Sequence, residues 1–409
     1  MDQRSSFHWS SYLLVLIAAF VTYWGLATFL LAGTYENPFA YFDKLAAAFL
    51  RGELYIQSDI KADLTFFGLK WYVPFPPLPA LLLVPYMWWT GAETADTVLF
   101  SIILSAFNVL MTYGILVQTA KRGWTKINRG DVIWLTVLFG LGTVHLYMAL
   151  QGSVWFLAQI ATYTFAALSV WLALAKRHPI LIGLALALAM LARPHIALLG
   201  LLLLAIWWHG REDSDRFSNL IKHTAWITLP LLVAVGSLLW YNFTRFEDPL
   251  DFGYTSQNVD PFLQDDLDTY GQFNPFFVPR NLRALLWAPP ELNGEGELDG
   301  FWPNRQGMSI FLTTPVFLVL LWRGRRDWLY AGAIASLALI LVPLLTYYNT
   351  GWWQFGYRFS LDFMMILMLL LAITAGERLG WVFKSLIVVS VLINVWGMIW
   401  FGIITGAVG

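Results

Sequence analysis

The stretch YLLVLIAAFVTYWGLATFLLA, residues 12–32, contains no charged residue and decides the fold class. A helix that crosses the roughly 30 Å hydrocarbon core of a bilayer needs about 20 apolar residues. The stretch therefore predicts a transmembrane helix. Arg4 precedes it, but the apolar run is longer than that of a signal peptide and has no obvious small-residue cleavage site, so we expect a retained first span.

The rest of the chain repeats this composition. Of 409 residues, 58% are hydrophobic and only 12% are charged, whereas a soluble domain has about a quarter charged residues. We predict an all-α polytopic membrane protein, one integral membrane domain over residues 1–409, with about eleven spans and a range of about ten to thirteen. The expected spans are 12–32, 98–119, 132–149, 154–175, 180–192, 195–209, 224–243, 309–322, 328–347, 359–375 and 382–403.

The apolar segment Pro77–Trp89 is short for a span and contains several prolines. If it is a re-entrant or interfacial helix, every strongly basic loop falls on one side. These loops are 121–129, 176–177, 211–222, 323–326 and 378–384. The positive-inside rule then predicts a cytoplasmic N-terminus, an extracytoplasmic C-terminus and two large outer loops, 34–97 and 244–308, with a short one at 348–358.

Several kinds of site are excluded or disfavoured. The chain has no cysteine, so it has no disulfide or thiolate site, and its six histidines lack the HxxxH spacing of zinc sites. We therefore expect no metal site from the residues alone. There is no P-loop and no dinucleotide-binding GxGxxG, and the net charge of −1 argues against nucleic acid.

The first outer loop begins with ENPFAYFDKLAAAFLRGELYI, residues 36–56. Its apolar spacing predicts an amphipathic helix over 41–52 on the outer surface, with Asp43 near the start. A partly desolvated carboxylate there can act as a general base, and Glu36 is the alternative base. Asp43 has a purely structural alternative, an electrostatic interaction with the helix N-terminus. Asp59 and Asp63 are four residues apart and either support a second role or form a solvated face.

Three further candidates for substrate binding lie where outer loops meet the membrane. Lys70 and Tyr72 belong to the Pro-rich, aromatic segment 70–79, whose rings suit either stacking on sugars or anchoring at the interface. Arg245 follows a span, where a guanidinium suits a lipid phosphate. Its alternative role is to extend toward lipid headgroups or to pair with Glu247.

The segment GWWQFGYRFSLD, residues 351–362, re-enters the membrane. Arg358 and Asp362 are spaced i, i+4 and are expected on one helix face, either as a substrate site or as a buried structural pair. Trp353 lies in the same segment. Arg193, with His195 across a proline, is a further candidate phosphate contact.

These segments, with KWYVPFPPLPALLLVPYMWWTG at 70–91 and NFTRFEDPLDFGY at 242–254, resemble polytopic GT-C glycosyltransferases. The bacterial relatives of the protein O-mannosyltransferase and aminoarabinose-transferase families are the most similar. The resemblance implies sugar transfer from a polyprenyl-phosphate donor at the extracytoplasmic face of a bacterial plasma membrane, within a GT-C-like fold with outer-face helices. Asp43 or Glu36 would be the base, and the arginines would stabilise the leaving phosphate. The clustered acids could hold a divalent metal ion, but the reaction does not require one.

The chain departs from the family pattern in the first outer loop, and we also expect it to lack the soluble C-terminal domain common in the family. The Asp-Glu pair expected after the first span is missing, and Pro38-Phe39 occupies its place. A lipid-linked-sugar transporter, or a non-catalytic subunit with partner proteins, is therefore the competing hypothesis. A transporter should carry ionisable residues near the membrane midplane, whereas this chain keeps most of its charge at the ends of its apolar runs.

Overall fold

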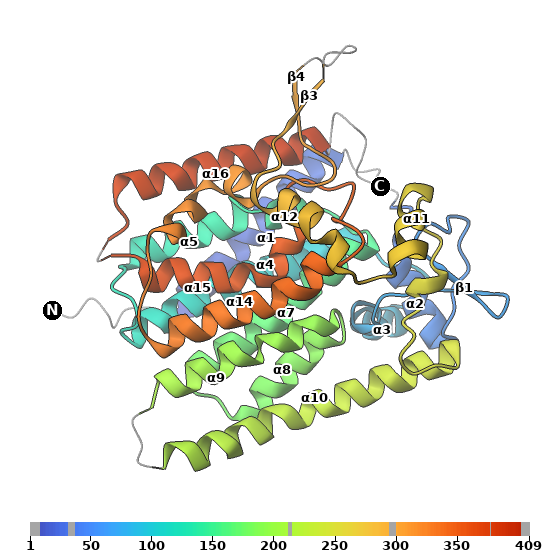
Figure 1. Cartoon of the computed structure of the whole chain (residues 1–409), viewed down its shortest axis with the longest axis horizontal. Helices are drawn as coiled ribbons and strands as arrows, with labels where there is room; N and C mark the ends of the chain where they lie inside the picture. The colour runs from blue at the N-terminus through green and yellow to red at the C-terminus, as the bar shows by residue number, and fades with distance from the viewer. Residues whose placement is uncertain (1–8, 32–36, 212–214, 294–299, 377, 402–409) are drawn as a thin grey trace.

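The computed structural model describes residues 9–31, 37–211, 215–293, 300–376 and 378–401 (Figure 1). Most of the helices run side by side in one bundle. At one end of this bundle, which we call the turn end, the connections are short. At the other, the loop end, lie the longer segments 37–96, 247–309 and 347–357.

Six helices of the described residues are long and apolar enough to cross a membrane. They are α1 (Trp9–Leu31), α4 (Thr97–Lys121), α7 (Val154–Leu174), α10 (Arg216–Phe246), α14 (Trp328–Thr346) and α16 (Trp381–Ile399). The chain is therefore a mostly helical protein of the membrane type, as predicted. Helices α4 and α7 are largely buried at the centre, whereas α1 is almost wholly exposed at the edge of the bundle.

The other expected spans are shorter or interrupted helices, so the number of about eleven spans stays a prediction. Prolines or 3-10 turns begin several of them. They are α5 (Arg129–Leu141) with α6 (His145–Ala149), α8 (Pro179–Met190), η2 (Pro194–Leu199) with α9 (Gly200–His209), α13 (Ile310–Thr313) with η5 (Pro315–Leu321), and η6 (Arg358–Phe363) with α15 (Met364–Thr374). Helix α15 is nevertheless buried along most of its length.

Short elements cover the loop end. They are α2 (Tyr41–Leu50), β1 (Thr65–Phe67), β2 (Lys70–Tyr72), α3 (Leu78–Thr90), η3 (Tyr254–Ser256), α11 (Pro261–Tyr270), η4 (Pro275–Phe277), α12 (Val278–Leu286), β3 (Glu291–Asn293) and β4 (Gly300–Trp302). The strands form two antiparallel hairpins, in which Thr65 pairs with Tyr72 and Glu291 with Trp302.

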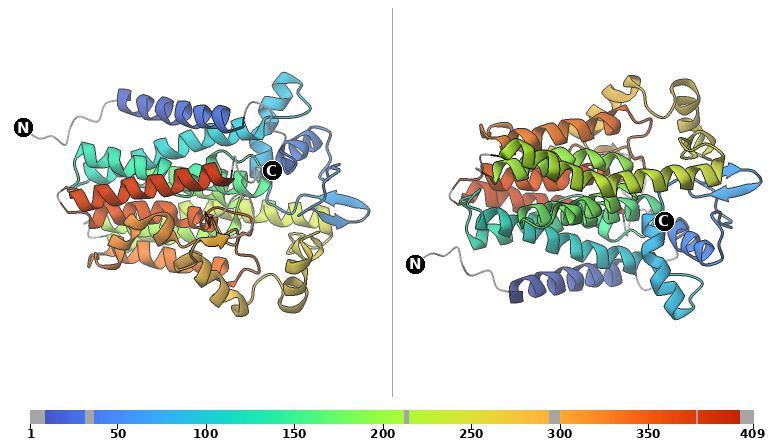
Figure 2. Two further views of the ribbon diagram at one scale, coloured as in Figure 1. Left: turned by 90° about the horizontal axis from the view of Figure 1, so that it is seen from above. Right: turned by 90° about the horizontal axis from the view of Figure 1, so that it is seen from below.

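Two expectations about the first loop are tested by this arrangement. Helix α3 is seen nearly end-on in Figure 1 and lengthwise in Figure 2, so it lies across the long helices, as expected for the segment Pro77–Trp89. Helix α2 forms where the spacing predicted it. It is not a surface helix, however, because it packs against α3 and buries Tyr41, Phe42 and Asp43.

Arginines at the turn end bind the carbonyl groups that helices leave free where they end. Arg122 Nε donates to the carbonyl of Leu174 at 2.6 Å. One terminal nitrogen of Arg325 donates to Trp124 and Ile373, at 2.6 and 3.2 Å. A cation near the negative end of the helix dipole is stabilising. The basic residues that predicted orientation therefore also have a structural role.

Glycines set how closely some helices approach. A Cβ atom added at Gly183 of α8 would lie 2.8 Å from Cα of Ile227 in α10, and closer still to its carbonyl oxygen. At Gly236 of α10, a Cβ atom would meet no atom within 4 Å. Both positions gain the same helix propensity on substitution by alanine, so the pair isolates the effect of packing.

We expect Gly183→Ala to destabilise the protein by about 1–3 kcal/mol, as overpacking usually does. The measurement is the apparent melting temperature of the detergent-purified protein. Gly236→Ala is the matched control and should leave that temperature unchanged or slightly raised. Equal melting temperatures for the two variants would contradict the close contact between α8 and α10.

Candidate functional site

A cavity of about 720 Å³ opens at the loop end, where the outer segments meet the bundle. Its walls come from α7, from the start of η2, from the end of α14 and from η6, and the loops 62–63 and 252–260 complete them. A cavity of this size suits a small ligand or part of a larger one. Its ionisable lining residues are Asp63, Arg193, His195, Tyr254, Asp260, Tyr347, Tyr348 and Arg358.

Arg358 brings a positive charge to this cavity, and no carboxylate of the described residues forms an ion pair with it. Its backbone is fixed, because its N–H donates to Gln354 Oε1 at 2.9 Å and its carbonyl accepts from Gln159 at 3.2 Å. The side chain is buried between the rings of Phe156 and Phe359. Among the described residues its Nε has no hydrogen-bond partner. A buried guanidinium in this state favours a bound anion.

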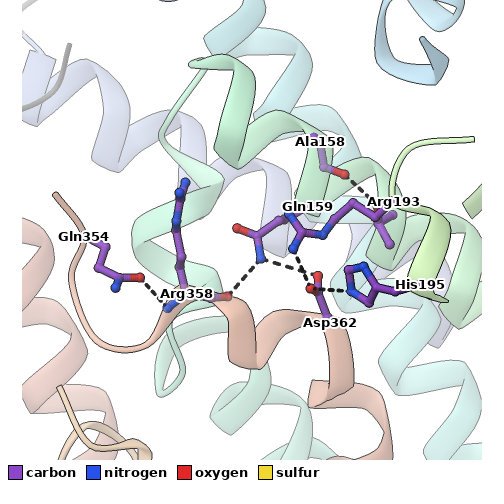
Figure 3. A network of polar contacts seen from close by, with 8 residues as sticks. Ala158, Gln159, Arg193, His195, Gln354, Arg358 and Asp362 are labelled. Carbon is purple, nitrogen blue, oxygen red and sulfur yellow. Dashed lines mark hydrogen bonds and ion pairs between the residues drawn. The ribbon is translucent and has the colours of Figure 1, made fainter. Parts of the chain in front are cut away.

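Asp362 organises the wall beside Arg358 (Figure 3). One carboxylate oxygen lies 2.9 Å from a terminal nitrogen of Arg193 and 3.0 Å from Nε2 of His195. The other accepts from the amide of Gln159 at 3.4 Å. The Asp362 side chain has no exposed surface, whereas those of Arg193 and His195 keep 19% and 18%. Asp362 therefore holds these two residues at the cavity without lining it.

The expected pairing of Arg358 with Asp362 is wrong. Residues 358–363 form a 3-10 helix, in which positions i and i+4 do not share a face. In Figure 3 the Arg358 side chain points away from Asp362, which pairs with Arg193 and His195 instead. The i, i+4 spacing predicts a shared face only in an α-helix, and this segment is a 3-10 helix.

Asp63 is, together with Asp260, one of the two described carboxylates that line the cavity. Its backbone is in the left-handed region, with φ of 59°, and its N–H donates to the carbonyl of Asn258 at 2.8 Å. Its carboxylate accepts from the Gln257 amide at 3.3 Å. Burial raises the pKa of Asp63 to about 6, against the opposing effects of the Arg358 charge and of a hydrogen bond from Trp155. This carboxyl group therefore exchanges protons near neutral pH.

Aromatic side chains supply much of the remaining wall. Trp353 lines the cavity and packs edge-to-face against Trp352, while its predicted role in substrate binding stays a prediction. Tyr254 contributes a phenol whose pKa burial raises to about 12, so its hydroxyl stays protonated and can donate a hydrogen bond. Flat rings and hydroxyl donors beside charged groups suit a polar ligand with an apolar face, such as a sugar phosphate.

Asp43 is not a lining residue of this cavity. It is buried in α2, and its carboxylate accepts from the N–H of Lys44 at 2.7 Å. Burial raises its pKa to about 6, partly offset by hydrogen bonds and charge from Lys44. Its role as the base stays a prediction, but its position favours a structural role. Glu36, the alternative base, lies outside the described residues.

Arg245, Lys70 and Tyr72 do not line the cavity either. The Arg245 guanidinium donates to the carbonyl of Val73 and to Asn242 Oδ1, both at 2.8 Å, so its hydrogen bonds join α10 to the first loop. Tyr72 is buried against the ring of Phe246. Lys70 is exposed, with its ammonium 4.4 Å from the centre of the Tyr55 ring. The sequence predicts substrate binding for all three because each lies in or next to an outer loop. In the structure, the contacts of Arg245 and Tyr72 hold the first loop against α10.

Arg193, Arg358 and Trp353, three of the residues predicted to bind substrate, line one cavity, and their binding role stays a prediction. The sequence indicated Asp63 less strongly and Gln159 not at all. For Gln159, a lone amide in an otherwise apolar span was the available signal. Within the described residues, no three His, Asp or Glu side chains are grouped so as to hold a metal ion. A scan against protein-family models gave no match, and a search of curated proteins gave none either.

We expect Asp362→Ala to lower the stability by about 3–5 kcal/mol, because removing one partner of a buried ion pair leaves the others uncompensated. The apparent melting temperature of the purified protein measures this loss. Asp265→Ala, which removes an exposed carboxylate in α11, is the matched control and should have little effect. A small effect of Asp362→Ala would contradict the organising role of this carboxylate.

Proposed function

We propose that the protein is a membrane glycosyltransferase that moves a sugar from a polyprenyl-phosphate donor to an acceptor hydroxyl. The observation that carries this proposal is the cavity in which Asp63 stands with Arg358 and Arg193. A base for the acceptor and cations for the leaving phosphate are the two groups that such a reaction needs. We further propose that the bundle crosses the membrane about eleven times, with the loop end extracytoplasmic.

The reaction proceeds as one displacement. The acceptor oxygen attacks the anomeric carbon while its proton passes to the Asp63 carboxylate. The bond from that carbon to the phosphate oxygen breaks, and its electron pair leaves with the lipid phosphate. The anomeric configuration is inverted because the acceptor attacks from the face opposite the leaving group. The guanidinium groups of Arg358 and Arg193 bind the phosphate as its charge develops.

The placement of Asp63 favours it over Asp43 as the base. Asp63 lines the cavity, whereas Asp43 is buried in α2 and does not line it. A base works best when its pKa lies near the working pH, and the pKa of Asp63, about 6, meets this condition. Burial raises the pKa of Asp63, and the positive charge of Arg358 limits this increase.

The end of α14 gives the donor lipid a route to the cavity. Pro343 and Leu344 lie on its wall, while other side chains of α14, such as Val342, are exposed on the outside of the bundle. A prenyl chain can therefore remain in the membrane beside α14 while its phosphate enters. The apolar surface of the helix solvates the chain, so no soluble carrier is needed.

We expect Asp63→Asn to lower transfer about 100-fold to 10,000-fold, the usual contribution of a general base. The assay follows sugar transfer from a panel of polyprenyl-phosphate sugars to acceptor alcohols. Asp43→Asn, which removes a carboxylate with a similarly raised pKa, is the matched control and should retain most of the activity. Loss of transfer in Asp43→Asn, with full activity in Asp63→Asn, would restore Asp43 as the base. If no donor in the panel supports transfer by the wild type, the proposed function fails.

The pH dependence gives a second test. Asp63 accepts the proton only as a carboxylate, so kcat/KM should rise with pH and level off above about 6. Below that pKa it should fall by about tenfold per pH unit. The same limb should persist in Asp43→Asn, because Asp43 is not the titrating base in this mechanism. A flat profile between about pH 5 and 7 would argue against a carboxyl base.

A further inference from the structure

We propose that a second hollow, at the tip of the loop end, binds an anionic glycan. It has a volume of about 560 Å³ and lies between residues 55–59 and strand β2. Lys44, Lys61 and Lys70 line it together with Tyr55 and Trp71. The proposal that this hollow binds a glycan does not depend on the function proposed for the catalytic cavity. The role of the hollow in presenting an acceptor rests on the proposed function.

The three ammonium groups are held beside aromatic rings. Lys44 lies 5.9 Å from the centre of the Tyr41 ring, Lys61 lies 5.2 Å from that of Trp71, and Lys70 lies 4.4 Å from that of Tyr55. Lys44 also donates to Ser58 Oγ at 3.1 Å. Cation–π contacts of this kind orient a lysine without neutralising its charge. The ammonium groups therefore stay available to an anion.

Nearby carboxylates, among them Glu53 close to Lys70 and Asp43 beside Lys44, offset only part of this charge. Asp59 is the acidic residue of the lining, against three lysines. Glu53 faces Arg51 Nε at 3.0 Å and accepts from the Tyr55 hydroxyl at 3.1 Å. No described carboxylate forms an ion pair with any of the three lysines within 4.0 Å. The hollow is therefore a positively charged surface.

The position of the hollow selects against lipid as its ligand. The β1–β2 hairpin projects beyond the loop end along the direction of the long helices (Figures 1 and 2). With the loop end extracytoplasmic, as proposed above, strand β2 with Lys70 faces away from the bilayer that surrounds the bundle. The ligand must approach from the side away from the membrane, as a polymer of the cell envelope would.

The segment 58–63 connects this hollow to the catalytic cavity. Ser58, Asp59 and Lys61 line the hollow, while Ala62 and Asp63 line the cavity. A chain molecule that binds the lysines is therefore held next to the proposed base. Sugar rings have an apolar face that packs on aromatic side chains, and Tyr55 and Trp71 are both half-buried with surface to offer. An anionic glycan satisfies both the charges and the rings, whereas an acidic peptide satisfies the charges alone.

The test measures binding to the full-length, detergent-purified protein without any donor, so it does not depend on transferase activity. The probes are an alginate oligosaccharide, which carries a carboxylate on every residue, a neutral dextran of equal length, and a poly-glutamate peptide of equal charge. We expect the wild type to bind alginate more tightly than either other probe, with an affinity that falls as salt is added.

The double variant Lys61→Gln, Lys70→Gln should weaken alginate binding about fivefold or more, because two exposed charges are lost. Both side chains are exposed, so the fold should be retained, and an unchanged melting temperature checks this. Lys222→Gln, an exposed lysine at the turn end, is the matched control and should bind as the wild type does.

Several outcomes would overturn the proposal. They are no alginate binding by the wild type, equal binding of dextran, and the same affinity in the double variant as in Lys222→Gln. Tighter binding of poly-glutamate than of alginate would assign the hollow to an acidic protein instead. If alginate binds as expected but no donor supports transfer, the glycan-binding proposal is retained and the proposed transferase function fails.

Discussion

The burial of the Asp362 carboxylate is the constraint on which the site depends. An ionised carboxylate without exposed surface is tolerated only when it is paired and hydrogen-bonded. Arg193, His195 and Gln159 meet this need from η2 and α7, while Asp362 itself lies in η6. The contacts of this one side chain therefore join three parts of the bundle that are far apart in the sequence. They also fix the direction in which Arg193 and His195 face the cavity.

Two helical segments around Asp362, η2 and η6, begin irregularly. Pro194 begins η2 and a 3-10 helix begins η6, so neither segment enters the bundle as a regular α-helix. Irregular backbone at membrane depth survives where protein or a water-filled cavity satisfies its polar groups. Here the carbonyl of Arg358 bonds to Gln159 and its N–H to Gln354. The interruptions open the cavity, and side-chain amides stabilise its edges.

The sequence predicted the helical membrane class, α2, the crosswise segment α3 and the cationic wall, because apolar period, proline content and charge position are local signals. It did not predict that Asp362 pairs with Arg193 and His195 and not with Arg358. The i, i+4 rule assumed an α-helix at 358–362, and the site segment is a 3-10 helix. Burial raises the pKa of both Asp43 and Asp63 to about 6, but only long-range packing decides that the first is buried in α2 and that the second lines the cavity. Such contacts join residues that are far apart in the chain; Gln257 and Asp63, for example, are 194 positions apart. They leave no pattern in the local sequence.

The backbone of Asp63 shows how this long-range packing acts on a single residue. A left-handed conformation is unfavourable for most side chains, and aspartate is among the few that adopt it readily. The hydrogen bond from its N–H to Asn258, and that from Asn258 N–H to Leu64, hold the first loop to the second in this conformation. The bond from the Thr65 hydroxyl to the carbonyl of Gly253 continues the same contact. The two outer loops thus hold each other in place, and the carboxylate points into the cavity as a consequence of that pairing. The position of the proposed base thus depends on both loops, and the sequence of either loop alone does not reveal it.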